Sequence, residues 1–175
     1  DDGPPRLSGP IAQAKGWRVV GLDLSPARRK FAQTMGIAVV DVPGGEDHAT
    51  ALEAAHGEER PRRVFDATGS EDGLAAAIAS VGVFGMVVTV GKGMWPLRFS
   101  PRLDVAELIR RQAAIVGSWV LPVHHYADMV ELMLSAGLSF SKLVTHRFPI
   151  EQAQEAFDTA SAPDAIGKVM LVWED

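Results

Sequence analysis

The alternation of strand-like and helix-like segments is the feature that most constrains this fold. Short apolar runs of strand length recur through the first two thirds of the chain, and each precedes a segment with Ala and Leu at helical spacing. Such alternation is typical of α/β proteins, in which parallel strands form one sheet. The runs are apolar throughout, which indicates strands buried on both faces. The sequence therefore predicts an α/β, doubly wound parallel sheet.

The expected elements follow one another regularly up to about residue 143. Strands are expected at 18–22, 37–42, 64–67, 84–90 and 114–120, and helices at 26–35, 49–56, 72–80, 105–111 and 126–136. The rhythm then changes to a strand at 144–148, a helix at 151–160 and a strand at 168–173. We therefore expect a Rossmann-like domain over residues 1–143 and a return segment over residues 144–175.

Asp23 is the most informative single position. It follows the first expected strand and precedes Ser25-Pro26, which is typical of a helix start. In a doubly wound sheet, an acid at the end of the second strand accepts hydrogen bonds from an adenosine ribose, and its charge repels a 2′-phosphate. The strand before Asp23 would be this second strand, because the first strand of the pattern would precede Gly3. Asp23 therefore favours NAD over NADP, although such a position also suits an ordinary polar residue. Arg28 could lie against the adenosine, but a solvated helix residue is the simpler interpretation of that position alone.

The glycine pattern of a dinucleotide-binding loop is incomplete here. That pattern is a strand, G-x-G-x-x-G and a helix, whereas only Gly3 matches it at the start of this chain, which alone favours a frayed tail. Thr68-Gly69 and Val90-Gly91 follow two later strands, where glycine lets a flat ligand approach the backbone. Each pair taken singly is an ordinary turn, but together with Asp23 they favour a dinucleotide crevice.

The remaining composition excludes several kinds of site. The sequence contains no cysteine, and no two of its five histidines show H-x-x-x-H spacing, so we expect no catalytic and no metal-binding residue in this chain. A net charge of −5 argues against nucleic acid as a partner. No apolar run reaches the roughly 18 residues of a membrane helix. We therefore expect a soluble, cytoplasmic protein.

Several segments together resemble a known family. They are Gly16 to Pro26, Val64 to Gly69, Val87 to Gly91, Val116 to Val120, Thr145 to Phe157 and Ile166 to Leu171. The first four resemble the coenzyme domain of the medium-chain dehydrogenase/reductase family. The last two resemble the returning segment of its zinc-type members, nearest to the alcohol, polyol and threonine dehydrogenases.

The resemblance implies a role for each candidate residue. Asp23 would hold the adenosine ribose and Arg28 would flank the adenine. Thr68 and Gly69 would line the dinucleotide path, and Val90, Gly91 and Ser118 would lie at the nicotinamide. The resemblance also implies an NAD-dependent oxidoreductase, in which hydride passes between the nicotinamide and an alcohol or carbonyl bound to zinc.

The resemblance further implies that this chain is part of a larger enzyme. The zinc ligands of the family belong to a GroES-like domain, which this sequence does not contain, and the central strand before Gly3 is also lacking. We therefore expect a chain that is inactive alone and that forms a homo-oligomer through the apolar edge strand at 114–120. Two alternatives remain: a non-catalytic nucleotide-binding fragment, and an S-adenosylmethionine-dependent methyltransferase, against which the dehydrogenase-like tail argues.

Overall fold

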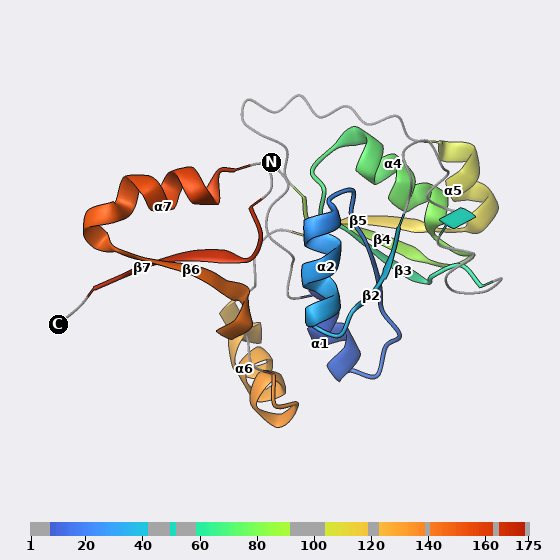
Figure 1. The fold of residues 1–175 in the computed structure, drawn as a ribbon. Coiled ribbons are helices and arrows are strands. Elements are labelled where there is room, and N and C mark those ends of the chain that lie inside the picture. The colour runs from blue at the N-terminus through green and yellow to red at the C-terminus, as the bar shows by residue number, and fades with distance from the viewer. Residues whose placement is uncertain are drawn as a thin grey trace. The chain divides into compact units, whose positions relative to one another are not determined.

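The fold in Figure 1 is that of a computed structural model, which describes most of the chain. The described residues are 8–41, 50–51, 59–91, 104–118, 123–138, 141–162 and 165–173. Their contacts divide the chain into two compact units. The first unit contains the described residues between Val40 and Val120, and the second contains those between Pro4 and Val39 and between Leu121 and Asp175. Each unit is described by itself.

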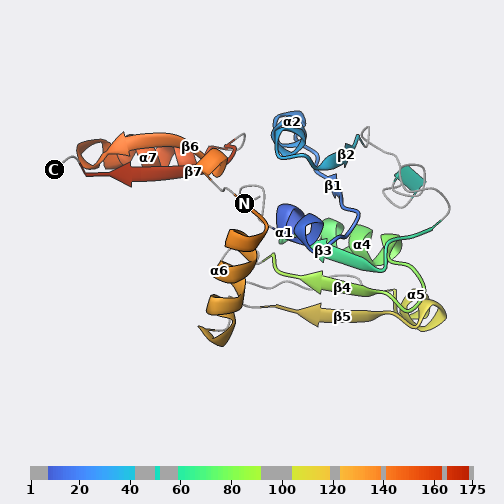
Figure 2. The same cartoon turned by 90° about the horizontal axis from the view of Figure 1, so that it is seen from below.

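The first unit contains a three-stranded parallel sheet. Its order is β3 (Arg63–Asp66), β4 (Met86–Thr89) and β5 (Ala114–Gly117), as Figure 2 shows. Helix α4 (Glu71–Ser80) lies between β3 and β4 in sequence, and α5 (Val105–Arg111) lies between β4 and β5. This alternation confirms the predicted α/β architecture with parallel strands, because the three strands follow the expected order of a doubly wound sheet.

The core of this unit lies between one face of the sheet and helices α4 and α5. Leu74, Ala77 and Ile78 of α4 are buried together with Val81 and Val87, and the last two are fully buried. The partly buried side chains that pack against this cluster are Val64, Leu108, Ala113 and Ile115. The register aligns Val64, Val87 and Ile115 across the three strands, so one row of side chains meets the helices.

The opposite face of the same sheet corrects the prediction that the strands are buried on both faces. Phe65 and Val116 are 45% and 40% exposed, and the register places both beside Val88 on that face. Successive side chains of a strand point to opposite faces, so a strand whose residues are all apolar is buried on both faces only where two layers cover it. In this unit the core cluster covers one face.

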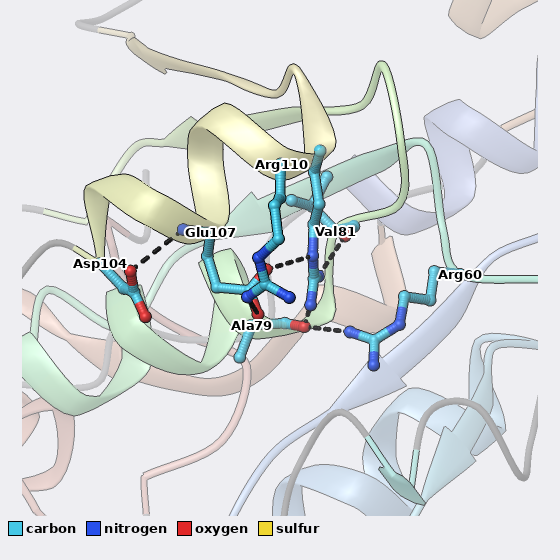
Figure 3. Close-up of polar contacts among 7 residues, drawn as sticks. Arg60, Ala79, Val81, Asp104, Glu107 and Arg110 are labelled. Carbon is cyan, nitrogen blue, oxygen red and sulfur yellow. Dashed lines mark hydrogen bonds and ion pairs between the residues drawn. The ribbon is translucent and has the colours of Figure 1, made fainter.

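Two arginines, Arg60 and Arg111, donate hydrogen bonds to backbone carbonyls at the end of α4; Figure 3 labels Arg60 and the acceptors Ala79 and Val81. Arg111 Nη1 donates to the carbonyl oxygens of Ala79 at 2.7 Å and Val81 at 2.5 Å, and Arg60 Nη1 also donates to Ala79 O. Arg111 Nε donates to Glu107 Oε2 at 3.0 Å. Because the last carbonyls of a helix lack partners within it, these guanidinium groups satisfy α4 and tie it to α5.

The second unit begins with a helix that the sequence does not predict. Helix α1 (Ser8–Ala14) comes after residues 1–6, for which the sequence favours a frayed tail and which lie outside the described residues. Gly9 and Pro10 indicate a loop locally, but α1 packs closely on Ile37: a Cβ added at Gly9 would lie 2.9 Å from Ile37 Cδ1. Tertiary contact therefore overrides local propensity here.

The predicted helix near residue 26 is confirmed. Helix α2 (Pro26–Thr34) begins after Ser25, whose hydroxyl accepts a hydrogen bond from Arg28 N at 3.4 Å, and Gly36 follows with a φ of +78°. Strands β1 (Val20–Leu22) and β2 (Ala38–Val40) flank α2 and form a two-stranded sheet. Both are shorter than expected. They correspond to the second and third strands of the predicted order.

The predicted strand, helix and strand near the end of the chain are also present. Strands β6 (Val144–Pro149) and β7 (Lys168–Val172) pair in parallel, and α7 (Ala153–Ala160) contacts both. They follow α6 (Tyr126–Ser135), and the short 3-10 helices are η1 (Val123–His125), η2 (Ser141–Leu143) and η3 (Ile150–Gln152). Of the helix expected at 49–56, only residues 50–51 lie in the described part, and both are helical. Within the described ranges, no helix is long and apolar enough to cross a membrane.

Candidate cofactor-binding site

Five of the residues singled out by the sequence lie at one edge of the sheet in the first unit. Thr68 and Gly69 follow β3, Val90 and Gly91 follow β4, and Ser118 follows β5. The strands are parallel, and their last registered residues are Asp66, Thr89 and Gly117. Their carboxyl ends therefore meet at the same edge, which is where open α/β sheets bind ligands.

The turns after β3 and β4 approach each other at backbone distance. Gly69 has a φ of +65°, a conformation that favours glycine. A Cβ added at Gly91 would lie 2.8 Å from Gly69 Cα and 3.0 Å from the carbonyl carbon of Ala67, and closer still to Gly69 N. There is no room for a side chain at Gly91. The two turns therefore pack backbone against backbone at the sheet edge.

Asp66 is a site residue that the sequence analysis did not identify. Its carboxylate is buried, with 3% of the residue exposed, and accepts hydrogen bonds from residues at the sheet edge. Oδ1 accepts from Thr68 N at 3.0 Å and Thr68 Oγ1 at 2.8 Å, and Oδ2 accepts from Thr89 Oγ1 at 2.9 Å. The available signal was a single acid in the apolar run Val64 to Ala67, since a buried charge requires dedicated partners.

The hydroxyl of Thr68 is fully engaged within the protein. It donates to Asp66 and accepts from Ser70 N and Ser70 Oγ, each at 3.2 Å. A hydroxyl has one donor and two acceptor lone pairs, so all three are used. Thr68 therefore contributes shape and backbone position to this edge, and its hydroxyl has no donor left for a ligand.

Asp23 lies directly after β1 in the second unit, as expected from the sequence. Asp23 Oδ1 accepts from Ser25 N at 2.8 Å, which fixes the carboxylate in an Asx turn before α2. Arg29 Nη1 donates to the carbonyl oxygens of Asp23 at 2.7 Å and Leu24 at 3.0 Å. Asp23 is half-buried, and among the described residues none donates a hydrogen bond to its Oδ2.

Arg28 differs from the simpler interpretation of its position. It is buried, with 6% of the residue exposed, rather than a solvated helix residue. It lies in the first turn of α2, the helix that starts three residues after Asp23. Its role beside an adenine stays a prediction. Gly3, the single match to the glycine-rich loop, lies outside the described residues.

The described residues do not fit a zinc site. None of the described His, Asp and Glu side chains forms a group of three that could hold a metal ion. The whole sequence contains no cysteine, so a thiolate ligand is also absent. Structural and catalytic zinc ions take three or four nitrogen, sulfur or carboxylate ligands. We therefore assign no metal chemistry to this part of the chain.

Comparisons with known proteins agree with this architecture. The family model described as zinc-binding dehydrogenase matches residues 7–135. L-Galactonate-5-dehydrogenase of Escherichia coli (strain K12) is 30% identical over 149 residues, which cover 85% of this chain and 42% of that protein. This chain thus spans less than half the length of that relative.

Solved structures show the same fold. An alcohol dehydrogenase from Thermotoga maritima superposes with a TM-score of 0.78 at 22% identity, covering 94% of this chain and 46% of that one. A protein from Sinorhizobium meliloti 1021, described as a zinc-binding dehydrogenase and bound to NADP, superposes with a TM-score of 0.76 at 18% identity, covering 97% and 48%. At these identities the likeness shows the fold alone.

Proposed function

We propose that this chain, which belongs to the zinc-binding dehydrogenase family, binds NAD(H) as the coenzyme-binding part of an alcohol or polyol dehydrogenase. The observation that carries this proposal is the pair of close-packed glycine turns, Gly69 and Gly91, at the carboxyl edge of parallel strands. A dinucleotide needs such a surface, because its phosphates and rings approach the backbone closely. NAD itself supplies the chemistry by accepting or returning a hydride.

Asp23 is the residue that we propose selects NAD over NADP. Its carboxylate is held by Ser25 N–H through one oxygen, and the other oxygen can accept from a ribose hydroxyl. A negative charge at this point repels the 2′-phosphate of NADP. The Sinorhizobium meliloti protein has the same fold and is bound to NADP, so the fold alone does not select NAD. The proposed preference for NAD therefore rests on Asp23 of this chain.

The substrate class that we propose is a small alcohol or polyol. Support comes from the family and from the name of the Escherichia coli relative, L-galactonate-5-dehydrogenase. No described residue is placed as an acid, base or metal ligand for the reaction. The role of this chain is therefore to bind and orient the coenzyme, within a protein whose other residues would choose the substrate.

We also propose that two copies pair through β5. This strand is the edge of its sheet, and Ala114, Val116 and Gly117 are exposed. An exposed apolar edge strand has unpaired N–H and C=O groups that a second copy can satisfy. In addition, we propose that the return segment begins at residue 144, where β6 starts.

Isothermal titration calorimetry of the 175-residue chain with NAD, NADP and S-adenosylmethionine tests the proposed function. We expect NAD to bind most tightly, and Asp23→Ala to weaken NAD by at least about tenfold, or about 1.4 kcal/mol. Asp128→Ala is the matched control, because Asp128 is an exposed acid on α6 that pairs only with His125 among the described residues. Binding of S-adenosylmethionine alone, or of no nucleotide, would refute the proposal.

A further inference from the structure

A single buried carboxylate connects two of the three strand ends that meet at the proposed coenzyme-binding edge, those of β3 and β4. Asp66 ends β3, and its side chain reaches both the turn that follows β3 and the end of β4. The proposed function uses Gly69 and Gly91 but gives Asp66 no role. A charge is expensive to bury, so such a group needs a structural or functional reason.

One arm of this network runs from Asp66 to the start of α4. Asp66 Oδ1 accepts from the backbone N–H and the hydroxyl of Thr68. Thr68 Oγ1 accepts from Ser70, and Ser70 Oγ in turn accepts from Gly73 N at 3.0 Å as the N-cap of α4. A continuous chain of hydrogen bonds through Thr68 and Ser70 therefore links Asp66 to the first turn of α4.

The other arm runs from Asp66 to the turn after β4. Asp66 Oδ2 accepts from the Thr89 hydroxyl, while the Asp66 carbonyl oxygen accepts from Val90 N at 2.8 Å and Gly91 N at 3.3 Å. Both glycine turns are thus anchored on the same residue. Gly91 is also pressed against Gly69, so a small shift of either turn would move the surface that they share.

We propose that Asp66 is a positioning residue for the coenzyme, which acts through Thr68 and Thr89 to hold the backbone of Gly69 and Gly91 in the binding arrangement. Asp66 itself is too buried to touch a ligand, and so it is not a catalytic residue. Its two oxygens fix two turns from different strands, which no single hydroxyl could do. This inference rests on the proposed binding of NAD.

The test compares the affinities of NAD and AMP for variants of the full chain. AMP reports the adenosine end, which we assign to Asp23, whereas NAD also reports the glycine turns. We expect Asp66→Ala to weaken NAD by at least about tenfold and AMP by less than about twofold. Asp66→Asn should restore NAD binding to within about threefold, because its amide oxygen can accept from Thr68 and its NH₂ can donate to Thr89 Oγ1.

A matched control separates positioning from stability. Ile78→Ala removes a buried side chain of α4, in the same unit as Asp66 but without any role in the network, and lowers the stability of that unit. It should leave the ratio of NAD to AMP affinity unchanged. If Asp66→Ala does not fold, Thr89→Val cuts only the link to Oδ2, and we expect it to lower NAD affinity selectively as well.

The outcomes distinguish the two proposals. If the unaltered chain binds no NAD, the proposed function fails and this inference fails with it. If the unaltered chain binds NAD but Asp66→Ala, or Thr89→Val in its place, binds NAD equally well, only the role of Asp66 is wrong. A parallel loss of NAD and AMP, or a change in their ratio in Ile78→Ala, would show that Asp66 acts on stability alone.

Discussion

Arg111 should contribute far more to stability than its neighbour Arg110. Both arginines lie in the last turn of α5 and both pair with Glu107. Of the two, only Arg111 also donates to the carbonyl oxygens of Ala79 and Val81 at the end of α4. The two side chains differ in exposure as well, at 15% for Arg111 and 70% for Arg110.

The expected magnitude for Arg111→Met follows from these contacts. A hydrogen bond from a charged donor contributes about 1.5–3 kcal/mol when it is buried, and Arg111 makes three such bonds. The site is partly exposed, so water can replace some of them, and methionine keeps the aliphatic packing of the side chain. We therefore expect a loss of about 2–4 kcal/mol in the free energy of unfolding. Arg110→Met should lose less than about 0.5 kcal/mol, as exposed ion pairs do.

Urea denaturation of the full chain, followed by circular dichroism at the helix band, measures this difference. The free energy of unfolding should fall clearly in Arg111→Met and remain nearly constant in Arg110→Met. Equal losses in the two variants, or no loss in either, would show that the contacts of Arg111 with the end of α4 do not stabilise the unit.

Three further predictions concern the proposed coenzyme-binding residues Gly91 and Asp23 and the edge strand β5. Gly91→Ala should weaken NAD binding at least about tenfold because its Cβ would strike the Gly69 backbone, whereas Asp128→Ala, at an exposed position of α6, should bind NAD normally in the same titration. Asp23→Asn keeps an acceptor for Ser25 N–H but removes the charge, so the ratio of NADP to NAD affinity should rise by about tenfold; an unchanged ratio would rule out Asp23 as the selector. Val116→Lys should convert a dimer to a monomer in sedimentation velocity, and a monomer before substitution would contradict pairing through β5.

Elements with complete local signals were predictable from the sequence. Helix α5 was predicted at 105–111 and has these bounds, because Asp104 caps its start by accepting from Glu107 N at 3.0 Å. Strand β4 is shorter than the predicted 84–90, since Phe84 adopts a φ of +55° in a turn and its N–H donates to Arg111 O. The apolar sequence pattern alone does not distinguish the first residues of a strand from those of the turn that precedes it.

Features that depend on distant contacts were not predictable. The formation of α1 depends on packing against Ile37, while its own Gly9 and Pro10 indicate a loop. The role of Asp66 depends on Thr89, which lies 23 residues away in sequence. The positions of Asp23, Gly69 and Gly91 at strand ends were predictable, because the carboxyl end of a parallel strand can be located from the pattern alone. Their role in coenzyme binding stays a prediction.

The central claim is that NAD binds at the strand ends of the first unit that carry Gly69 and Gly91, and nuclear magnetic resonance tests it most directly. In ¹H–¹⁵N spectra of the labelled chain, NAD should shift the amide signals of Gly69 and Gly91 as well as that of Ser25, while AMP should shift Ser25 and leave the two glycines nearly unchanged. Amides of α6 should not move. Shifts confined to α6 or to the β6–β7 pair, or saturating NAD without any shift at the glycines, would contradict the account.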